Sequence, residues 1–572
     1  MDIFFVISGF LISKSIILQS EHNSFKPVRF YQGRFKRIVP AYLLMMIGCI
    51  AIAVFNFPKP DFDKFFYQAK AALLFFSNQE FSTTLDYFGT ANHENLLLHT
   101  WSLSIEMQFY LFLPLIYVLF TKKFRTKILI LLFVLFLAFT EYQLHILGNQ
   151  SKMYFSLLPR SLEFMFGIAL NYIPKSDPLS KSQKNIVGFL SLMMIVASLF
   201  LLNENSIFPG WLSFPVCLGT AGIVWAASGK INDFFSTAPL VYVGKISYSL
   251  YLWHWPVLAF YRYKTMNYEI ERMDMLWLVP VFTAFSLLSF YLVEEPFRRL
   301  KGRKLLQYGF IACVFAAVIW RGSNYSNRKL VNIPEPYVKY VPFINHNRFL
   351  GYMLIGDTAV ADQKILLIGD SHCLSMLEFF DTIGKSHQLN FSFLSTASVV
   401  PIPGYENFNF PSLKEKERHA RLSKIGDQLI EQSDIVLLIR NWIFDYDFSL
   451  QTEYLENKIS PSQSLIVLKA YPTLKDNPVR KYLSLEKPDD FRTEEILYPL
   501  YNQHLTKSIA EKPNFYLLDL SHNEIYDQIP FINDTMSYYD HKHLNFYGAR
   551  RLAESAGDEV ADLLLKLKNR ND

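Results

Sequence analysis

The chain has 572 residues, of which 51% are hydrophobic, 16% are aromatic and 19% are charged, and its formal net charge is +5. This composition is too apolar for a single soluble domain and too charged for a chain that lies entirely within a membrane. No basic stretch is interleaved with aromatic residues, so the sequence does not predict a nucleic-acid partner.

Apolar runs long enough to cross a bilayer occupy the chain up to about residue 321. A membrane-spanning helix needs about 20 such residues. The runs lie near 2–19, 38–57, 99–121, 127–146, 154–172, 186–202, 211–228, 244–261, 276–294 and 305–321. A shorter apolar stretch at 65–77 is typical of a re-entrant or interfacial segment. The N-terminal part is therefore predicted to be a polytopic α-helical membrane domain with about ten spans.

Basic residues gather in alternate connections between these runs, at 26–37, 122–127, 175–184 and 298–304. Short connections rich in Lys and Arg stay in the cytoplasm. With about ten spans, both ends of the chain then lie on the other side of the membrane. Residues from about 322 onward are therefore expected outside the cytoplasm, in the periplasm if the host is a Gram-negative bacterium, with the spans in the inner membrane.

The soluble part alternates short apolar strands with helix-like stretches. The predicted strands are 364–368, 434–439, 464–468 and 515–520, and the predicted helices include 373–383 and 419–432. This rhythm predicts an α/β domain with a mainly parallel sheet. The predicted organisation is a membrane domain at 1–321, a linker at 322–363 and an extracytoplasmic domain at 364–572. No metal-ligand cluster or cysteine redox pair is visible, and no bound cofactor is predicted.

A candidate nucleophile, Ser371, lies where the first predicted strand ends, in Gly369-Asp370-Ser371-His372. A serine hydroxyl needs a base to take its proton, and that base needs a partner that fixes its tautomer. Asp540 and His543, near the end of the chain, could supply both functions. His541 is an alternative base because it adjoins Asp540. The preferred triad is Ser371, His543 and Asp540, which would handle an acyl group.

With these blocks, residues 364–565 resemble an SGNH-type hydrolase or acyltransferase domain. The resemblance implies an oxyanion hole that includes a glycine block and an asparagine block. Asn441, which follows the strand at 434–439, could present its amide to the oxyanion beside the backbone N–H of Ser371. Membrane-fused relatives usually read Arg-Trp at this point, whereas this chain reads Arg440-Asn441-Trp442.

The membrane part is similar to the acyltransferase-3 family of multispanning O-acyltransferases. The segments that carry the similarity are 2–12, 30–40, 99–106, 244–256 and 293–299. Arg34 and Arg37 lie one helical turn apart, where two guanidinium groups could bind phosphates. The resemblance assigns them to the phosphates of acyl-CoA, most simply acetyl-CoA, as the donor substrate. The alternative for them is ordinary positive-inside anchoring.

Four further ionisable residues lie within or at the edges of apolar spans: Glu106, Arg160, Glu163 and His254. Such groups are functional candidates because burying them is costly. For Glu163, a structural pairing with an arginine of another helix is an equal alternative. In the family, a first helix carrying an arginine and a catalytic histidine precedes the segment that begins here at Asp2. The chain is therefore expected to come from a start codon assigned too late, the alternative being a truncated gene product whose membrane site is incomplete, and no membrane-domain base is named.

The fused arrangement resembles bacterial enzymes that O-acetylate lipopolysaccharide O-antigen or peptidoglycan. The leading hypothesis is thus an O-acyltransferase that acts on an extracytoplasmic polysaccharide or glycolipid, with Ser371 as the acyl acceptor and His543 as the base. A serine esterase is one alternative. Another is a transporter with an accessory glycan-binding domain, which would keep its activity after Ser371→Ala.

Overall fold

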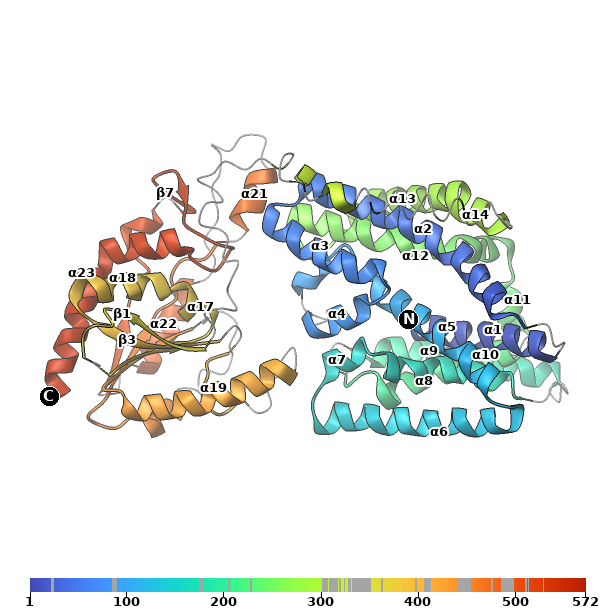
Figure 1. Cartoon of the computed structure of the whole chain (residues 1–572), viewed down its shortest axis with the longest axis horizontal. Helices are drawn as coiled ribbons and strands as arrows, with labels where there is room; N and C mark the ends of the chain where they lie inside the picture. Colours follow the sequence, from blue (N-terminus) through green and yellow to red (C-terminus); the bar gives the residue numbers. More distant parts are fainter. Residues whose placement is uncertain are drawn as a thin grey trace. The chain divides into compact units, whose positions relative to one another are not determined.

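The computed structural model divides into two compact units, Met1–Leu330 and Val331–Asp572 (Figure 1). It describes residues 1–571 apart from 22–24, 85–89, 174–179, 204–205, 227–228, 301–306, 308–316, 318–319, 324, 328–330, 332–350, 362–363, 397–398, 406–412, 441–453, 475–476, 485–497, 510–511, 513 and 528. Asn441, most of the run 305–321 and most of the predicted linker lie outside these residues.

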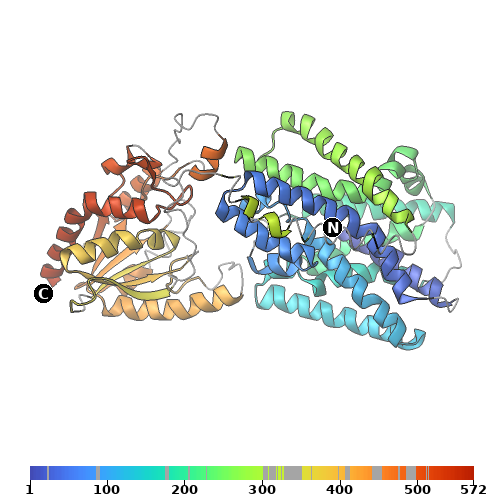
Figure 2. The ribbon, with the colours of Figure 1, turned by 45° about the horizontal axis from the view of Figure 1, so that its top comes forward.

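The first unit is a bundle of helices. Its longer helices are α1 (Asp2–Glu21), α2 (Pro27–Asn56), α3 (Lys59–Leu73), α5 (Thr100–Leu119), α6 (Lys122–Glu141), α8 (Leu157–Leu170), α9 (Lys181–Leu201), α10 (Phe214–Ala226), α12 (Ala238–Thr265) and α13 (Arg272–Ser289). The short helices are α4 (Ser77–Thr84), α7 (Gln150–Tyr154), α11 (Lys230–Phe235) and α14 (Glu295–Arg299). Figure 2 shows the long helices lying side by side.

Within the described residues, six segments are long and apolar enough to cross a membrane. They are Asp2–Ser20, Pro27–Asn56, Thr100–Leu119, Lys123–Ile146, Lys181–Leu201 and Arg272–Arg299. The other four predicted spans are not among these six segments, and the reason differs from one to the next. The helices α8 and α10 have 14 and 13 residues, fewer than the roughly 20 of an upright crossing. Helix α12 has 28 residues, but its predicted run contains Lys245, His254 and several tyrosines, which make it less apolar than the six segments. The fourth run, 305–321, lies mostly outside the described part of the chain.

Two glycines let α1 and α8 cross at backbone contact. A Cβ atom on Gly9 would lie 2.1 Å from the carbonyl oxygen of Phe164, and one on Gly167 would lie 1.9 Å from the carbonyl oxygen of Val6. Small residues at a helix crossing permit this close approach, which is a common device of membrane bundles. The crossing fixes α1, which contributes Ser8 and Ile7 to the interior described below.

The second unit is a three-layer α/β domain built on a six-stranded sheet. Its strands are β1 (Gly351–Gly356), β2 (Ile365–Gly369), β3 (Asn390–Ser395), β4 (Ile435–Ile439), β5 (Ser464–Leu468) and β6 (Phe515–Leu518), in the order β1-β3-β2-β4-β5-β6. Only the β1–β3 pair among them is antiparallel. The predicted mainly parallel sheet is confirmed, and β1 shows that it begins within the stretch predicted as a linker.

Alternate residues of the central strands face opposite helix layers. Leu367 and Leu437 pack with α18 (Leu377–His387) and α23 (Phe546–Asn571). Leu366 and Val436 pack on the other face, toward α19 (Leu413–Gln432) and α22 (Tyr498–Ile509). Figure 1 shows α18 and α23 on one side of the sheet and α19 on the other. Burial on both faces explains why these strands are continuous apolar runs.

Candidate active sites

The nucleophile candidate lies at the carboxyl edge of the sheet. Strand β2 ends at Gly369, Asp370 caps the short helix α17 (Ser371–Ser375), and Ser371 is the first residue of that helix. The Asp370 carboxylate accepts a hydrogen bond of 2.8 Å from the backbone N–H of His372. A Cβ on Gly369 would lie 1.7 Å from the carbonyl oxygen of Ile439, so only glycine fits between β2 and β4 here. This close contact fixes the end of β2 against β4 and thereby the position of Ser371, two residues later.

The loop before α23 brings Asp540 and His543 to that serine. His543 Nε2 lies 2.9 Å from Ser371 Oγ, and His543 Nδ1 lies 2.9 Å from Asp540 Oδ2. Because a carboxylate only accepts, Nδ1 carries the proton and Nε2 presents its lone pair to the serine hydroxyl. The three residues predicted to act together are thus joined in one hydrogen-bonded chain.

The same carboxylate organises its own loop. Asp540 Oδ1 accepts from the backbone N–H groups of Lys542 and His543 at 2.8 and 2.9 Å. The backbone N–H of Tyr539 donates to the carbonyl of His543 at 2.8 Å. Asp540 therefore fixes both the backbone and the imidazole of His543, which is why a spacing of three residues suffices.

His541, the alternative base, occupies a different position. Its backbone carbonyl accepts from the N–H of Leu474 at 2.7 Å, which ties this part of the loop to the segment after β5. Of the two histidines, His543 is the one that contacts Ser371 Oγ in the structure. Burial, followed by the nearby Lys542 and His543, lowers the pKa of His541, with Asp540 acting in the opposite sense.

The carboxyl group of Asp540 stays ionised. Burial alone would raise its pKa, but His543 and the N–H of Lys542 outweigh burial, and the pKa of Asp540 lies well below its usual range. An ionised Asp540 can hold the proton of His543 Nδ1 and stabilise the imidazolium that forms when Nε2 takes a proton.

One backbone donor for an oxyanion belongs to the nucleophile itself. The N–H of Ser371, at the first position of α17, has no acceptor within that helix. The next N–H, that of His372, is already committed to Asp370. Asn441, predicted as the second donor, lies outside the described residues, although β4 ends beside β2 at Ile439.

His372 is a neighbour of the triad that the sequence did not identify. Its ring centroid lies 4.8 Å from that of His543 and 5.4 Å from that of Tyr471. Only 5% of the residue is exposed. Because it follows Ser371 directly, the sequence could predict that His372 lies near the nucleophile, but not that its ring packs against His543.

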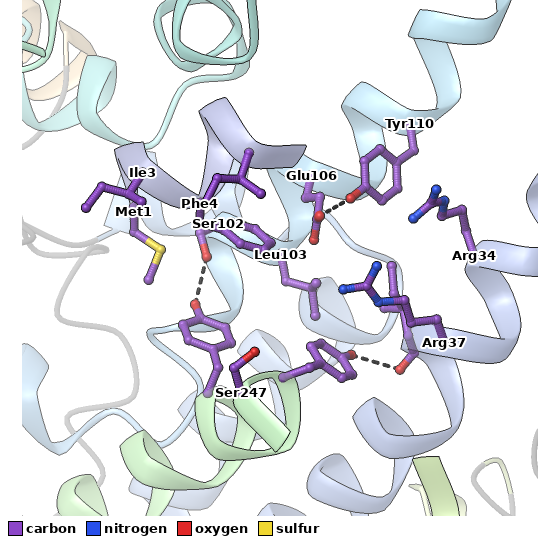
Figure 3. Close-up of a pocket in the computed structure, with 14 residues that line it drawn as sticks. Met1, Ile3, Phe4, Arg34, Arg37, Ser102, Leu103, Glu106, Tyr110 and Ser247 are labelled. Carbon is purple, nitrogen blue, oxygen red and sulfur yellow. Dashed lines mark hydrogen bonds between the residues drawn. The ribbon is translucent and has the colours of Figure 1, made fainter. Parts of the chain in front are cut away.

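The first unit contains a cavity of about 340 Å³ (Figure 3). Helices α1, α2, α5 and α12 supply its walls, and the lining residues are Met1, Ile3, Phe4, Ile7, Arg34, Arg37, Ile38, Ser102, Leu103, Glu106, Tyr110, Ser247, Tyr248 and Tyr251. Arg34, Arg37 and Glu106, predicted from separate segments, thus line one space. Figure 3 shows both guanidinium groups on the side of the cavity that holds Glu106 and Tyr110.

Glu106 is tied to two residues that the sequence did not single out. Its Oε1 accepts a hydrogen bond from Ser8 Oγ at 2.8 Å and another from the hydroxyl of Tyr110. The Arg34 guanidinium lies 5.5 Å from the centroid of the Tyr110 ring and 5.6 Å from that of Phe30. Such cation–π contacts hold the guanidinium in place while leaving its N–H donors for a ligand.

His254 does not line this cavity. Its Nδ1 lies 2.8 Å from the carbonyl oxygen of Tyr251 and 3.2 Å from that of Leu250, on its own helix α12. Its ring centroid is 6.1 Å from that of His99. Its neighbour Tyr251 does line the cavity, and the Tyr251 hydroxyl is 2.7 Å from Ser102 Oγ, another lining residue.

Arg160 and Glu163 form a buried ion pair away from the cavity lining. Arg160 Nη1 lies 2.7 Å from Glu163 Oε1 and 2.9 Å from Asp2 Oδ1, and the side chains of Arg160 and Glu163 are both fully buried. The guanidinium also lies 4.5 Å from the centroid of the Tyr154 ring. The partner of Glu163 therefore comes from its own helix, and the cross-helix carboxylate is Asp2 of α1. The interior position favours a structural role.

Comparison with known proteins matches both units to one domain arrangement. Residues 1–295 match a family described as an acyltransferase domain, and residues 342–556 match one described as an SGNH domain fused to such domains. An uncharacterized protein of Haemophilus influenzae is 38% identical over 243 residues, which cover 40% of this chain and 98% of that protein.

Two further similarities concern named proteins. The peptidoglycan O-acetyltransferase OatA of Listeria monocytogenes is 29% identical over 321 residues, and the match covers 52% of this chain and about half (51%) of that protein. The periplasmic domain of a lipopolysaccharide acetyltransferase of Salmonella ser. Paratyphi A aligns with 34% of this chain and 83% of that domain, with 16% identity and a TM-score of 0.28.

Proposed function

Because this chain belongs to the acyltransferase family in which a membrane domain is fused to an SGNH domain, we propose that it moves an acyl group from cytoplasmic acyl-CoA to a hydroxyl of an extracytoplasmic polysaccharide. A glycan such as lipopolysaccharide O-antigen is the proposed acceptor, and acetyl is the proposed acyl group. The observation that carries the proposal is the hydrogen-bonded chain Ser371–His543–Asp540, present in the same polypeptide as the acyltransferase domain.

The proposed chemistry at Ser371 has two steps. In the first, Oγ attacks the acyl carbonyl, His543 Nε2 takes the hydroxyl proton and then gives it to the leaving group of the donor. In the second, a sugar hydroxyl attacks the acyl-enzyme, and the same Nε2 takes its proton and returns it to Ser371 Oγ. The backbone N–H of Ser371 stabilises the oxyanion in both steps.

The donor side is assigned to the cavity of the first unit. Arg34 and Arg37 line it together, and paired guanidinium groups suit the phosphates of acyl-CoA. Glu106, Tyr110 and Ser8 form a polar chain in the same region. This arrangement supports binding of the donor with its phosphates at the arginines and its acyl end deeper in the bundle.

The membrane topology completes the proposal. Basic residues near the start of α2 and the end of α14 support a cytoplasmic position for these helix ends. The proposal counts α8, α10, α12 and the run 305–321 as crossings beside the six longer segments, and with ten crossings the second unit lies outside the cytoplasm of a bacterial inner membrane. The acyl group would then cross the bilayer through the membrane domain before it reaches Ser371.

Mass analysis of surface polysaccharide tests the proposal. A deletion strain of the source organism is complemented with the full-length gene or with its Ser371→Ala variant. We expect the acyl ester to return with the first and to be absent with the second, while His522→Ala, an exposed histidine of the same unit, serves as the control.

Two outcomes would count against it. An acyl ester that persists with Ser371→Ala would remove the serine from the pathway. A polysaccharide that never carries the ester, combined with Ser371-dependent hydrolysis of acylated glycans by the purified protein, would make the protein an esterase instead.

A further inference from the structure

The ring of His372 packs against the imidazole of His543, the proposed base. The two ring centroids are 4.8 Å apart with an interplanar angle of 54°, and the ring of Tyr471 lies 5.4 Å away on another side. With 5% of its surface exposed, His372 is part of the interior rather than of the substrate-facing edge. Its ring therefore limits how far the His543 ring can tilt.

Hydrogen bonds of Ser375 connect the backbone of His372 to the neighbouring Tyr471. The hydroxyl of Ser375 donates to the carbonyl of His372 at 2.8 Å, and Ser375 Oγ lies 2.8 Å from the hydroxyl oxygen of Tyr471. Tyr471 is thereby fixed as the second wall of the same pocket. Because the ring of His372 packs against both His543 and Tyr471, it can keep the His543 side chain in one orientation, which a catalytic base requires.

One nitrogen of His372 has an unusual environment. Among the described residues, the buried Nε2 atom has no hydrogen-bond partner. An unpaired buried polar atom destabilises the folded state, and a phenylalanine of similar shape would avoid that penalty. Local exceptions of this kind concentrate at functional sites.

The groups around His372 keep it uncharged. Burial is the largest effect, and the positive or protonatable groups His543, Lys542 and Arg440 act in the same sense, while only Asp540 opposes them. The pKa of His372 consequently lies well below its usual range. A neutral ring can lie against an imidazolium without electrostatic repulsion.

We propose that His372 is a positioning residue, whose ring packs against the His543 imidazole and holds it between Asp540 and Ser371. The inference deepens the proposed function and rests on it, because it takes Ser371 as the nucleophile. The ring contact of 4.8 Å restricts the orientation of the His543 imidazole, which the proton transfers at Ser371 require.

A fluorophosphonate probe tests this inference on the full-length protein in detergent. The probe reacts when Ser371 Oγ forms a bond to phosphorus and fluoride leaves, and His543 takes the serine proton. The first-order limiting rate of labelling and the half-saturating probe concentration are measured from pH 5 to 9 for the wild type, His372→Ala, His372→Phe and the exposed control His522→Ala.

We expect His372→Ala to lower the limiting rate about tenfold with little change in the half-saturating concentration. His372→Phe should restore the rate to within about threefold of the wild type, because it returns a neutral ring to the same position. The acid side of its pH profile should coincide with that of the wild type, since His372 is already neutral there.

The inference is overturned if His372→Ala labels at the wild-type rate, if His372→Phe loses as much as His372→Ala, or if the phenylalanine variant shifts the acid side of the profile. Amide hydrogen exchange of β2 shows whether each variant is folded, and the phenylalanine variant decides the question if the alanine variant is not. If the Ser371→Ala variant were labelled as fast as the wild type, Ser371 would not be the nucleophile, and the proposed function would fail with it.

Discussion

Asp540 accepts hydrogen bonds from two backbone N–H groups and from the His543 ring through one carboxylate. An amide at this position would present an NH₂ group where acceptors are needed, and it would favour the wrong tautomer of His543. We expect Asp540→Asn to lower the rate of Ser371 labelling or acyl transfer by roughly 10³-fold to 10⁴-fold, by analogy with other triads.

The measurement for this change is the fluorophosphonate labelling rate at pH 7 of the full-length protein. Asp534→Asn, in the turn between the short strands β7 (Phe531–Ile532) and β8 (Thr535–Met536), provides a control for the general effect of losing one carboxylate from this region. A rate within tenfold of the wild type would show that Asp540 does not set the tautomer of His543.

His372 also determines how the second unit responds to acid. Its pKa in the folded state is lower than the roughly 6.5 of an unfolded histidine, so the unfolded chain binds the proton more tightly. The stability that depends on this group is therefore complete above pH 6.5 and is lost as the pH falls below it, by up to about 1.4 kcal/mol per pH unit.

The variant His372→Phe lacks this titration. Its free energy of unfolding, measured from hydrogen exchange of the β2 amides, should fall less between pH 7 and pH 5 than that of the wild type. Asp540 does not mask the difference, because the stability that its lowered pKa provides is lost only as the pH falls below the roughly 3.9 of an unfolded aspartate. Equal pH slopes for the two proteins would contradict the neutral state of His372.

At the scale of elements, the contact between β2 and β4 decides where the nucleophile is placed. A Cβ atom added to Gly369 would lie 1.7 Å from the Ile439 carbonyl oxygen and 2.6 Å from Cys373 Cβ. We expect Gly369→Ala to destabilise the second unit by about 3 kcal/mol, because the strands would have to separate.

Gly557→Ala is the matched control for that change. It lies in α23, where the added Cβ would meet only the side chain of Ile383, at 3.2 Å, and alanine favours a helix over glycine by about 1 kcal/mol. Hydrogen exchange of the β2 and β4 amides measures both variants. Similar protection in Gly369→Ala and the wild type would mean that this close approach is not required.

At the scale of the whole molecule, each unit has its own core, and the two proposed sites can be tested separately. Arg34→Gln combined with Arg37→Gln removes the proposed phosphate contacts from the cavity. We expect the acyl-CoA-dependent ester on the polysaccharide to fall at least tenfold, because two charge-assisted contacts are lost.

Labelling of Ser371 by a fluorophosphonate, which needs no acyl-CoA, should persist in that double variant. Arg29→Gln, an exposed position on the same helix α2, provides the control for loss of positive charge. Equal ester levels in the double variant and in Arg29→Gln would reduce the arginine pair to membrane anchoring.

The sequence alone determined the features that depend on local pattern. Strands β2, β4 and β5 were visible because strands buried on both faces are continuous apolar runs, and the edge strand β6 was visible because it too is apolar throughout. Ser371 was placed correctly because it lies two residues after the end of β2. Strands β1 and β3 were not predicted, since edge position and mixed polarity weaken that pattern. The membrane class followed equally from the length of the apolar runs.

Only the tertiary structure decided which residues from distant segments meet. The contact between Ser371 and His543 spans 172 residues, and that between Ser8 and Glu106 spans 98. The gathering of Arg34, Arg37 and Glu106 around one cavity has the same origin. Such meetings depend on how helices and strands pack, which no local spacing encodes, and the ring of His372 lies against His543 for that reason.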